Sequence, residues 1–256
     1  MILVETWKRY LTELDSVKNL ESSFKMKDSL HPEFWKEGDL LDSEIADRLY
    51  EIAKNFFDSL GLDWVDIVDV IVTGSLANYN WSEFSDIDLH VLVDFDQIDE
   101  NQELIKEYLT AERMGWNRTH DIRIKGFEVE VYVQDSKEDH VSTGIYSIIK
   151  DEWIRKPNKE DISIDWGTVE KKATSLMDEI DAVYSLFKED KYEEAEKSAL
   201  RMKEKIRKFR RAGLDEAGQY SPENIAFKVL RRNEYLKKLS SLRIMAYDKK
   251  MSIKEE

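Results

Sequence analysis

Residues 68–93 read VDVIVTGSLANYNWSEFSDIDLHVLV, and this stretch decides the fold. The apolar runs 68–73 and 89–93 indicate two buried strands. Gly74 and Ser75 end the first strand, and Asp86-Ile87-Asp88 leads into the second. Because successive side chains on a strand point to opposite faces, Asp86 and Asp88 are expected to share one face.

Two neighbouring carboxylates repel each other, and a cation between them is the usual way to stabilise such a pair. A set of oxygen ligands suits Mg²⁺ or Mn²⁺. The spacing of Asp86 and Asp88 therefore predicts a site for one of these metals. The alternative is a solvated turn with two surface aspartates, which is typical of an isolated Asp-x-Asp.

The Gly74-Ser75 pair has a separate role in this interpretation. Glycine permits a sharp turn and a close approach of the backbone to a ligand. Residues 76–80 are expected to begin a short helix, whose backbone N–H groups would face a phosphate together with the Ser75 hydroxyl. A phosphate site one loop away from a metal-binding carboxylate pair is what phosphoryl or nucleotidyl transfer needs.

Gly74-Ser75 followed by Ser85-Asp86-Ile87-Asp88-Leu89 resembles the signature of the polymerase-β-type nucleotidyltransferase superfamily, with the spacing of its minimal members. The resemblance covers about residues 66–135. The whole chain is also similar to uncharacterised nucleotidyltransferase-like proteins of tailed-phage and bacterial genomes. The family pattern often has Arg-Gly where this chain has Asn78-Tyr79, so the usual arginine that contacts the triphosphate is missing there.

The resemblance implies a third carboxylate on a neighbouring strand. Residues 121–134 read DIRIKGFEVEVYVQ and predict a hairpin that turns at Lys125-Gly126. Glu128 and Glu130 would both face away from the core. Glu130 is preferred as the catalytic and metal-binding acid because it lies deeper in the strand, and Glu128 is placed beside the nucleotide or in solvent. The alternative is an edge strand with a polar outer face.

Several polar residues near these strands remain open to two interpretations. His90 should share the face of Asp88, where it either lines the site or bonds within the sheet. The segment after the hairpin carries polar side chains that either contact a base or ribose or pack against the sheet: His140, Ser142, Thr143 and Tyr146.

Composition narrows the class of protein without deciding the function. The 256 residues have a net charge of 39 − 54 = −15, which argues against binding to long nucleic acid. There is no cysteine, which excludes disulfides and cysteine-based zinc sites. No apolar stretch approaches the length of a membrane span, and the first residues lack the pattern of a signal peptide. We therefore expect a cytoplasmic protein without a membrane partner.

The predicted architecture is α/β (α+β), with a small mixed nucleotidyltransferase sheet flanked by helices and a C-terminal helical bundle. The expected domains are residues 1–156, which include N-terminal helices, and residues 157–256, where strand signals vanish. Apolar periodicity and capping residues predict helices over residues 6–19, 43–60, 98–110, 168–189, 192–212 and 222–247. Gly213 and Gly218 mark the expected break before the last helix.

Lys228, Arg231 and Arg232 are spaced i, i+3 and i+4, which places them on one face of the last helix. We call these three residues the basic stripe. In an acidic protein the basic stripe predicts a site for nucleotide phosphates or for a short acidic part of the acceptor. The alternative is an ordinary solvated helix face whose charges pair with glutamates.

The resemblance implies a metal-dependent transfer of a nucleoside monophosphate from a nucleoside triphosphate, such as ATP, to an acceptor hydroxyl. The acceptor is a protein side chain, a small molecule or an RNA end. Two other functions stay open: an alarmone-synthetase-like pyrophosphokinase, and a catalytically inactive nucleotide-binding module of the same fold.

Overall fold

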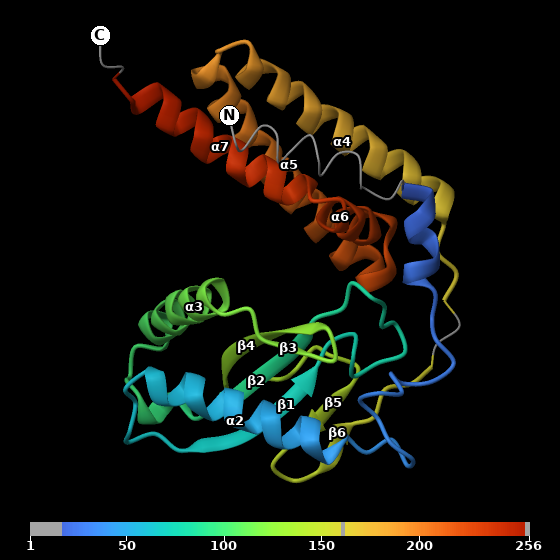
Figure 1. The fold of residues 1–256 in the computed structure, drawn as a ribbon, viewed down its shortest axis with the longest axis vertical. Helices are drawn as coiled ribbons and strands as arrows, with labels where there is room; N and C mark the ends of the chain where they lie inside the picture. Colours follow the sequence, from blue (N-terminus) through green and yellow to red (C-terminus); the bar gives the residue numbers. More distant parts are fainter. Residues whose placement is uncertain (1–16, 160–161, 254–256) are drawn as a thin grey trace. The chain divides into compact units, whose positions relative to one another are not determined.

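The computed structural model describes residues 17–159 and 162–253, and Figure 1 shows their fold. The chain divides into two compact units, one being Ser23–Asp161 and the other built mainly from Ile162–Glu256. The domain boundary expected after residue 156 stays a prediction. Of the helix expected over residues 6–19, residues 6–16 lie outside the described part, and Val17–Phe24 forms a short 3₁₀ helix, η1.

A six-stranded mixed sheet forms the centre of Ser23–Asp161, in the order β3-β4-β2-β1-β5-β6. β2 pairs with β4 in parallel, whereas the other neighbouring strands are antiparallel. This arrangement agrees with the predicted α+β class. The strands are β1 (Ile67–Thr73), β2 (Ile87–Val93), β3 (Arg123–Ile124), β4 (Phe127–Asp135), β5 (Ile145–Ser147) and β6 (Glu152–Arg155).

The predicted hairpin is confirmed. β3 and β4 are antiparallel, and the two residues between them, Lys125 and Gly126, have φ of 51° and 88°. Two positive φ values in a two-residue turn give the twist that suits a tight hairpin.

One face of the sheet carries the core of this unit. Alternate residues of β2 and β4 are buried there, including Leu89, Val91 and Val131 with no exposed surface. Helix α2 (Ser43–Ser59) packs its apolar side onto this core, as its periodicity predicts. The Asp42 carboxylate caps α2 by accepting hydrogen bonds from the first backbone N–H groups.

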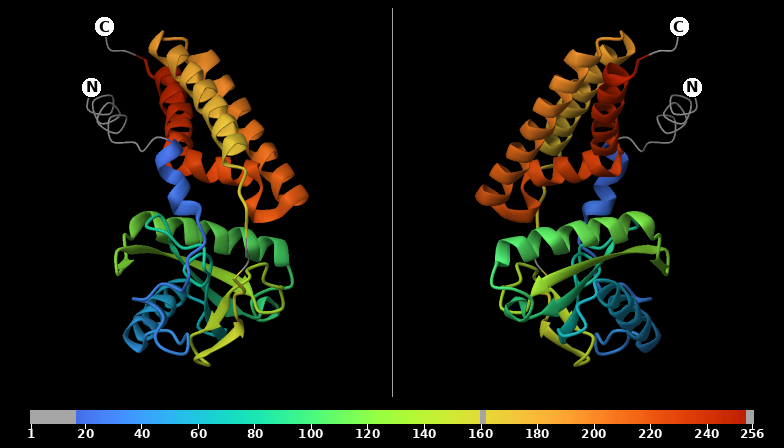
Figure 2. Two further views of the ribbon diagram at one scale, coloured as in Figure 1. Left: turned by 90° about the vertical axis from the view of Figure 1, so that its right-hand side faces the viewer. Right: turned by 90° about the vertical axis from the view of Figure 1, so that its left-hand side faces the viewer.

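Helix α3 (Gln102–Thr119) lies along the outer edge of β4, as both views in Figure 2 show. The Asn117 amide donates to the Val131 carbonyl at 3.2 Å and accepts from the Val131 N–H at 3.1 Å. Asn117 thereby satisfies backbone groups that a bare strand edge would leave unpaired. The helix expected over residues 98–110 begins later because the Asn101 side chain caps it, and it continues to Thr119.

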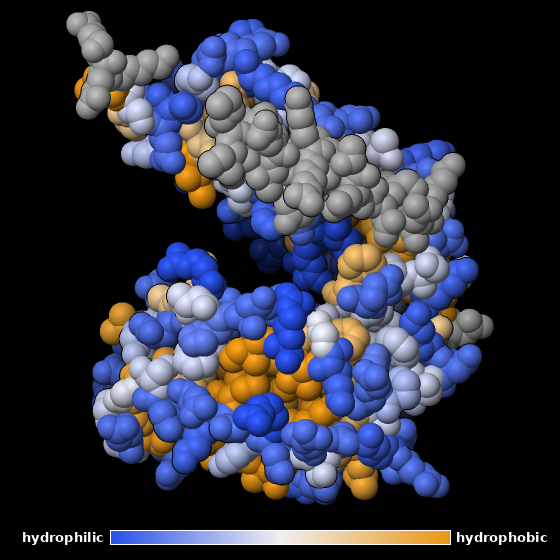
Figure 3. Space-filling model, in the orientation of Figure 1, coloured by the Kyte–Doolittle hydropathy of each residue, from blue (hydrophilic) through white to orange (hydrophobic). Residues whose placement is uncertain are grey.

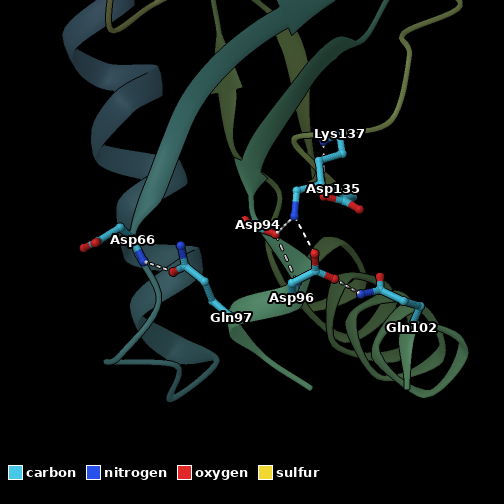
Figure 4. Close-up of polar contacts among 7 residues, drawn as sticks. All are labelled: Asp66, Asp94, Asp96, Gln97, Gln102, Asp135 and Lys137. Atoms are coloured by element: carbon cyan, nitrogen blue, oxygen red, sulfur yellow. Dashed lines mark hydrogen bonds and ion pairs between the residues drawn. The ribbon is translucent and has the colours of Figure 1, made fainter. Parts of the chain in front are cut away.

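The carboxyl ends of β2 and β4 are held together by one lysine. Lys137 Nζ lies 2.7 Å from Asp94 Oδ1 and 2.5 Å from Asp96 Oδ2, as Figure 4 shows. The Gln102 amide at the start of α3 donates to Asp96 Oδ1 at 2.8 Å. These contacts join the end of β2, the segment after β4 and the start of α3.

The segment from β4 to β5 crosses the second face of the sheet. It must pass β2 and β1 because β5 lies on the far side of β1. The His140 ring contacts the His90 ring edge-on at 5.0 Å, so the crossing runs over the face that carries His90. Arg155 of β6 fixes the segment by donating to the carbonyls of His140 and Ser142.

The second unit consists of helices, and four α-helices are described where three are expected. Their bounds are α4 (Trp166–Lys188), α5 (Tyr192–Ala217), α6 (Pro222–Arg232) and α7 (Tyr235–Met251). The helix expected over 222–247 is interrupted at Asn233 and Glu234, because Glu234 adopts a left-handed conformation with φ of 58°. Figure 3 shows mainly hydrophilic residues on the visible surface of these helices.

Gly213 does not break α5 as expected. It is buried within the helix, and a Cβ at this position would lie 2.8 Å from Ser221 Oγ. The glycine therefore permits a close approach to the N-cap of α6. No helix in the described part of the chain is both long and apolar enough to cross a membrane.

Candidate functional site

The parallel pairing of β2 with β4 sets Asp88 beside Glu130. The two residues are register partners, and Thr73 pairs with Asp88 from the other side. Neighbouring strands lie about 4.8 Å apart, so the two carboxyl groups occupy adjacent positions on the face opposite the core. Asp86 directly precedes β2, and both aspartates are partly buried. The sheet thus brings together the start of β2 and the start of β4, which carry all three predicted acids.

Glu128 and Glu130 have different surroundings. Glu128 Oε2 lies 3.6 Å from the Arg123 guanidinium, and Arg123 is its register partner on β3. The Glu130 carboxylate instead accepts a hydrogen bond from the Tyr132 hydroxyl two residues along the same strand. Only Glu130 is the direct register neighbour of Asp88, which favours it over Glu128 as the third acid of the site.

Gly74 lies directly against the site because it has no side chain. Its φ is +76°, and a Cβ there would overlap Asp88 Oδ2 and lie 2.9 Å from Asp88 Cγ. The backbone at Gly74 therefore packs directly against the Asp88 carboxylate. Any other residue would displace that carboxylate and also strain the backbone.

Hydrogen bonds among serines join the two ends of the loop between β1 and β2. The loop does not contain the expected helix. Residues 76–80 form turns, with one hydrogen bond from Asn78 N–H to the Ser75 carbonyl at 3.1 Å. The hydroxyls of Ser75 and Ser85 lie 2.8 Å apart, and Ser82 N–H donates to Ser85 Oγ. The helix prediction was wrong because side-chain bonds across the loop replace the helical ladder.

Asn78 occupies the position where the family pattern often has arginine, and its contacts are internal. Its side chain is buried, donates to Thr143 Oγ1 and accepts from Tyr79 N–H at 2.8 Å. Close by, Gly144 packs on the Ala77 carbonyl so tightly that a Cβ would overlap it. Asn78 thus ties the loop after β1 to the crossing segment.

The polar face continues beyond the acids as a stack of rings. The His90 and Tyr132 rings are stacked with centroids 4.8 Å apart, and His90 Nδ1 lies 3.1 Å from Gln134 Oε1. The Arg113 guanidinium of α3 lies over the Tyr132 ring at 4.7 Å. His90 therefore shares the face of Asp88, and its hydrogen bond is made within the sheet.

Burial sets the protonation of these rings. It lowers the pKa of His90 to about 4, reinforced by the nearby His140 and Arg113 and opposed by the Gln134 hydrogen bond. Burial also raises the pKa of Tyr132, and the hydrogen bond to Glu130 raises it further. At neutral pH the imidazole is uncharged and the phenol keeps its proton. The Tyr132 hydroxyl is therefore a fixed donor to the Glu130 carboxylate.

The polar residues of the segment that crosses from β4 to β5 mostly make hydrogen bonds within the protein. Tyr146 is fully buried and donates to Asp151 Oδ1 at 2.6 Å, while Thr143 is bonded to Asn78. The Ser142 hydroxyl donates to the Gly144 carbonyl at 2.9 Å. These contacts favour the interpretation in which the segment packs against the sheet.

A second pair of carboxylates already has a cation between them. Asp94 and Asp96 share Lys137, whose pKa their hydrogen bonds raise above its usual range. Residues 17–159 and 162–253 contain no group of three His, Cys, Asp or Glu side chains already arranged to hold a metal ion. The metal predicted at Asp86, Asp88 and Glu130 therefore remains a prediction based on the chemistry of the donors.

The basic stripe belongs to α6 in the other unit. Arg231 is exposed, whereas Lys228 and Arg232 are partly buried. Arg210 of α5 lies over the Phe227 ring at 4.3 Å, and burial lowers its pKa with help from the charge of Arg231. A further cation thus lies near the stripe.

Two residues of the polar face were missed as site residues. Tyr132 follows Glu130 by two positions, so the strand alternation already put it on the same face. Arg113 has no comparable signal, since only the packing of α3 against β4 brings it over the Tyr132 ring.

Residues 51–156 match the family model of the nucleotidyltransferase domain. The matched part contains all six strands of the sheet, Gly74 and the three acids, whereas the basic stripe lies outside it. The chain matches no curated protein and no solved structure.

The contact of Gly74 with Asp88 gives a first prediction. Replacing Gly74 by Ala should weaken the binding of a nucleoside triphosphate with Mg²⁺ by at least about tenfold, because the Cβ must displace the carboxylate. Isothermal titration calorimetry measures this change.

Gly126→Ala is the matched control. Gly126 also has a positive φ, +88°, but a Cβ there meets nothing within 4 Å. Both variants should lose about 1 kcal/mol of stability through backbone strain. Only Gly74→Ala should lose ligand affinity, and equal losses of affinity in both variants would refute the steric explanation.

Proposed function

Because residues 51–156 belong to the nucleotidyltransferase family, we propose that this protein is a metal-dependent nucleotidyltransferase. It would move a nucleoside monophosphate from a nucleoside triphosphate, such as ATP, to an acceptor hydroxyl. The observation that carries the proposal is the register pair Asp88–Glu130, with Gly74 packed against Asp88 at the end of β1. Because the reaction consumes nucleoside triphosphates, we also propose that the protein acts in the cytoplasm.

The donor set fits the metal that we propose. Asp86, Asp88 and Glu130 offer carboxylate oxygens, which Mg²⁺ and Mn²⁺ prefer. All three lie at the same end of β2 and β4, and a cation there would offset their mutual repulsion. When bound, the metal would supply charge neutralisation for the triphosphate and acidify the attacking hydroxyl.

The chain's own residues have separate roles in the proposed reaction. The backbone at Gly74, which lies beside Asp88, and the neighbouring Ser75 hydroxyl would hold the outer phosphates. The acceptor oxygen forms a bond to the α-phosphorus while the bond to the pyrophosphate oxygen breaks. Glu130 would take the proton from the acceptor hydroxyl, and the Tyr132 hydroxyl would keep the Glu130 carboxylate in a fixed orientation.

One measurement separates this function from the two alternatives. The protein is incubated with radiolabelled nucleoside triphosphates, Mg²⁺ and candidate acceptors. Release of pyrophosphate supports nucleotidyl transfer. Release of adenosine monophosphate from ATP would indicate a pyrophosphokinase, and binding without either product would indicate an inactive nucleotide-binding module. The acceptors to compare are proteins, small molecules and RNA ends.

The second prediction tests the metal. Replacing both Asp86 and Asp88 by Asn should abolish Mg²⁺-dependent nucleotide binding and leave the fold intact, since the amides keep the size but lose the charge. Calorimetry measures binding, and circular dichroism checks folding. Asp94→Asn is the control, because Asp94 pairs with Lys137 at the other end of β2. Unchanged binding in the double variant would refute the assignment of the site.

The third prediction ranks the two glutamates. Glu130→Gln should reduce turnover by about a hundredfold or more and leave nucleotide binding largely in place, as expected for loss of a general base. Glu128→Gln should have a much smaller effect, because Glu128 pairs with Arg123 at the edge. Initial rates of pyrophosphate release test both. The opposite ranking would assign the third acid to Glu128.

The fourth prediction concerns the basic stripe, which we propose as a site for nucleotide phosphates or for a short acidic part of the acceptor. Replacing Lys228, Arg231 and Arg232 by Ala should raise the dissociation constant of the nucleotide by at least about tenfold, with a larger effect at low salt. Removing the paired lysines Lys197 and Lys205, which contact Glu193 and Glu179, should have no such effect. If affinity and salt dependence stay the same, the stripe is an ordinary solvated helix face.

A further inference from the structure

A cavity of about 200 Å³ lies beside α3 at the outer edge of β4. Its walls include Lys106, Thr110 and Arg113 from α3 and Tyr132 and Gln134 from β4. These side chains offer two cations, a hydroxyl and an amide around one small space. Apolar side chains complete the wall, and a few convergent polar groups in such a cavity are a feature of small-ligand binding sites.

Arg113 is the unusual member of this set. It is partly buried, and its guanidinium makes no hydrogen bond or ion pair with any residue of the described ranges 17–159 and 162–253. Its contact is with the ring face of Tyr132 at 4.7 Å. Arginine carries five N–H donors, and partly buried arginines normally find acceptors. In a protein with net charge −15, an arginine with free donors is suited to an anionic ligand.

The other charged residues of the cavity are already paired. Lys106 forms an ion pair with Glu138, the one acidic side chain of the wall. Glu138 therefore does not neutralise Arg113, and Lys106 contributes little free charge. The planar guanidinium of Arg113 can meet two oxygens of a carboxylate or phosphate at once.

The position of Arg113 relative to the acids indicates which substrate would bind there. One tyrosine side chain connects the two sites, because Arg113 lies over the Tyr132 ring and the Tyr132 hydroxyl bonds to Glu130. Across the sheet the order is Gly74 after β1, Asp88 on β2, Glu130 on β4 and then Arg113 beyond the edge of β4. Gly74 and Arg113 therefore lie on opposite sides of the carboxylates.

An in-line displacement needs this separation. The attacking oxygen and the leaving oxygen lie on opposite sides of the phosphorus. If the outer phosphates of the donor lie beside Gly74, the acceptor must approach from the side of Glu130. Resting on the proposed function, we propose that the Arg113 cavity binds a carboxylate or phosphate group of a small acceptor and so presents its hydroxyl to Glu130.

The test uses inorganic phosphate as a probe and needs no turnover. The full-length protein is titrated with phosphate by calorimetry at constant ionic strength, without divalent metal. Arg113→Gln should weaken phosphate binding by at least about tenfold. Arg118→Gln is the matched control, since it removes the same charge from an exposed position on the same helix, and it should leave binding unchanged. Equal effects of the two variants would overturn the cavity as the site.

Two further variants keep the test interpretable. Arg113→Lys retains the charge and the contact with the ring but loses the planar fork, so it should fold normally and bind phosphate with intermediate affinity. Tyr132→Phe keeps the ring beneath the guanidinium and should retain phosphate binding. If Arg113→Lys folds and binds as tightly as the original protein, specific recognition by the guanidinium is refuted. Acetate in place of phosphate shows which anionic group the cavity prefers, and binding of neither anion would overturn the proposal.

Competition identifies the substrate. Saturation with a non-hydrolysable nucleoside triphosphate analogue and Mg²⁺ should change the affinity for phosphate by less than about twofold, since donor and acceptor sites are separate. Displacement of phosphate by the analogue would show that Arg113 holds the donor and would overturn the acceptor assignment. Displacement by a short single-stranded RNA would overturn the assignment to a small molecule.

The outcome is independent of the proposed reaction. If Asp86 and Asp88 prove unnecessary for nucleotide binding while Arg113 binds phosphate, the reaction fails and the anion site stands. If nucleotide binding depends on the aspartates while Arg113→Gln binds phosphate normally, the reaction stands and the cavity fails.

Discussion

The parallel pairing of β2 with β4 is the constraint on which the rest of the site depends. Its register sets Leu89 beside Val131 on one face and Asp88 beside Glu130 on the other. A slip of one residue would turn every side chain of a strand to the opposite face. Each fully buried apolar side chain contributes about 1.5–3 kcal/mol, whereas two carboxylates 4 Å apart repel by about 1–4 kcal/mol at the dielectric of water or of a protein surface. Burial of the apolar face therefore fixes the register, and the acids are held close together despite their repulsion.

The surroundings of the acids limit how far they can move. The backbone at Gly74 packs against the Asp88 carboxylate, and the Tyr132 hydroxyl bonds to Glu130. Asn78 joins the loop after β1 to Thr143 in the crossing segment. The loop that we propose for phosphate binding is thus held by side-chain bonds. Because the loop is already rigid, it would lose less conformational entropy when a ligand binds.

The basic residues of the chain differ in how their charge is used. Lys238 is buried in the helical unit, where it pairs with Asp181 and lies near the rings of Tyr184 and Tyr235. The charge of such a lysine is already paired with a carboxylate and is not available to a ligand. Arg113 is the contrasting case, with a ring beneath its guanidinium and a cavity in front of it. The number of lysines and arginines therefore says little about anion binding until their partners are known.

The sequence by itself determined β1 to β4, the hairpin between β3 and β4, and on which face of its own strand Asp88 or Glu130 lies, because the two-residue period of a strand is a local property. It also determined the cap of α2 at Asp42, since capping needs only neighbouring residues. The helix expected over 76–80 and the unbroken helix over 222–247 were wrong, because bonds across the loop and the left-handed Glu234 replaced the local preference. Only the tertiary structure decided that Asp88 pairs with Glu130 and that Arg113 reaches Tyr132. These contacts join elements separated along the chain, and the energies that set them arise from packing of the whole core.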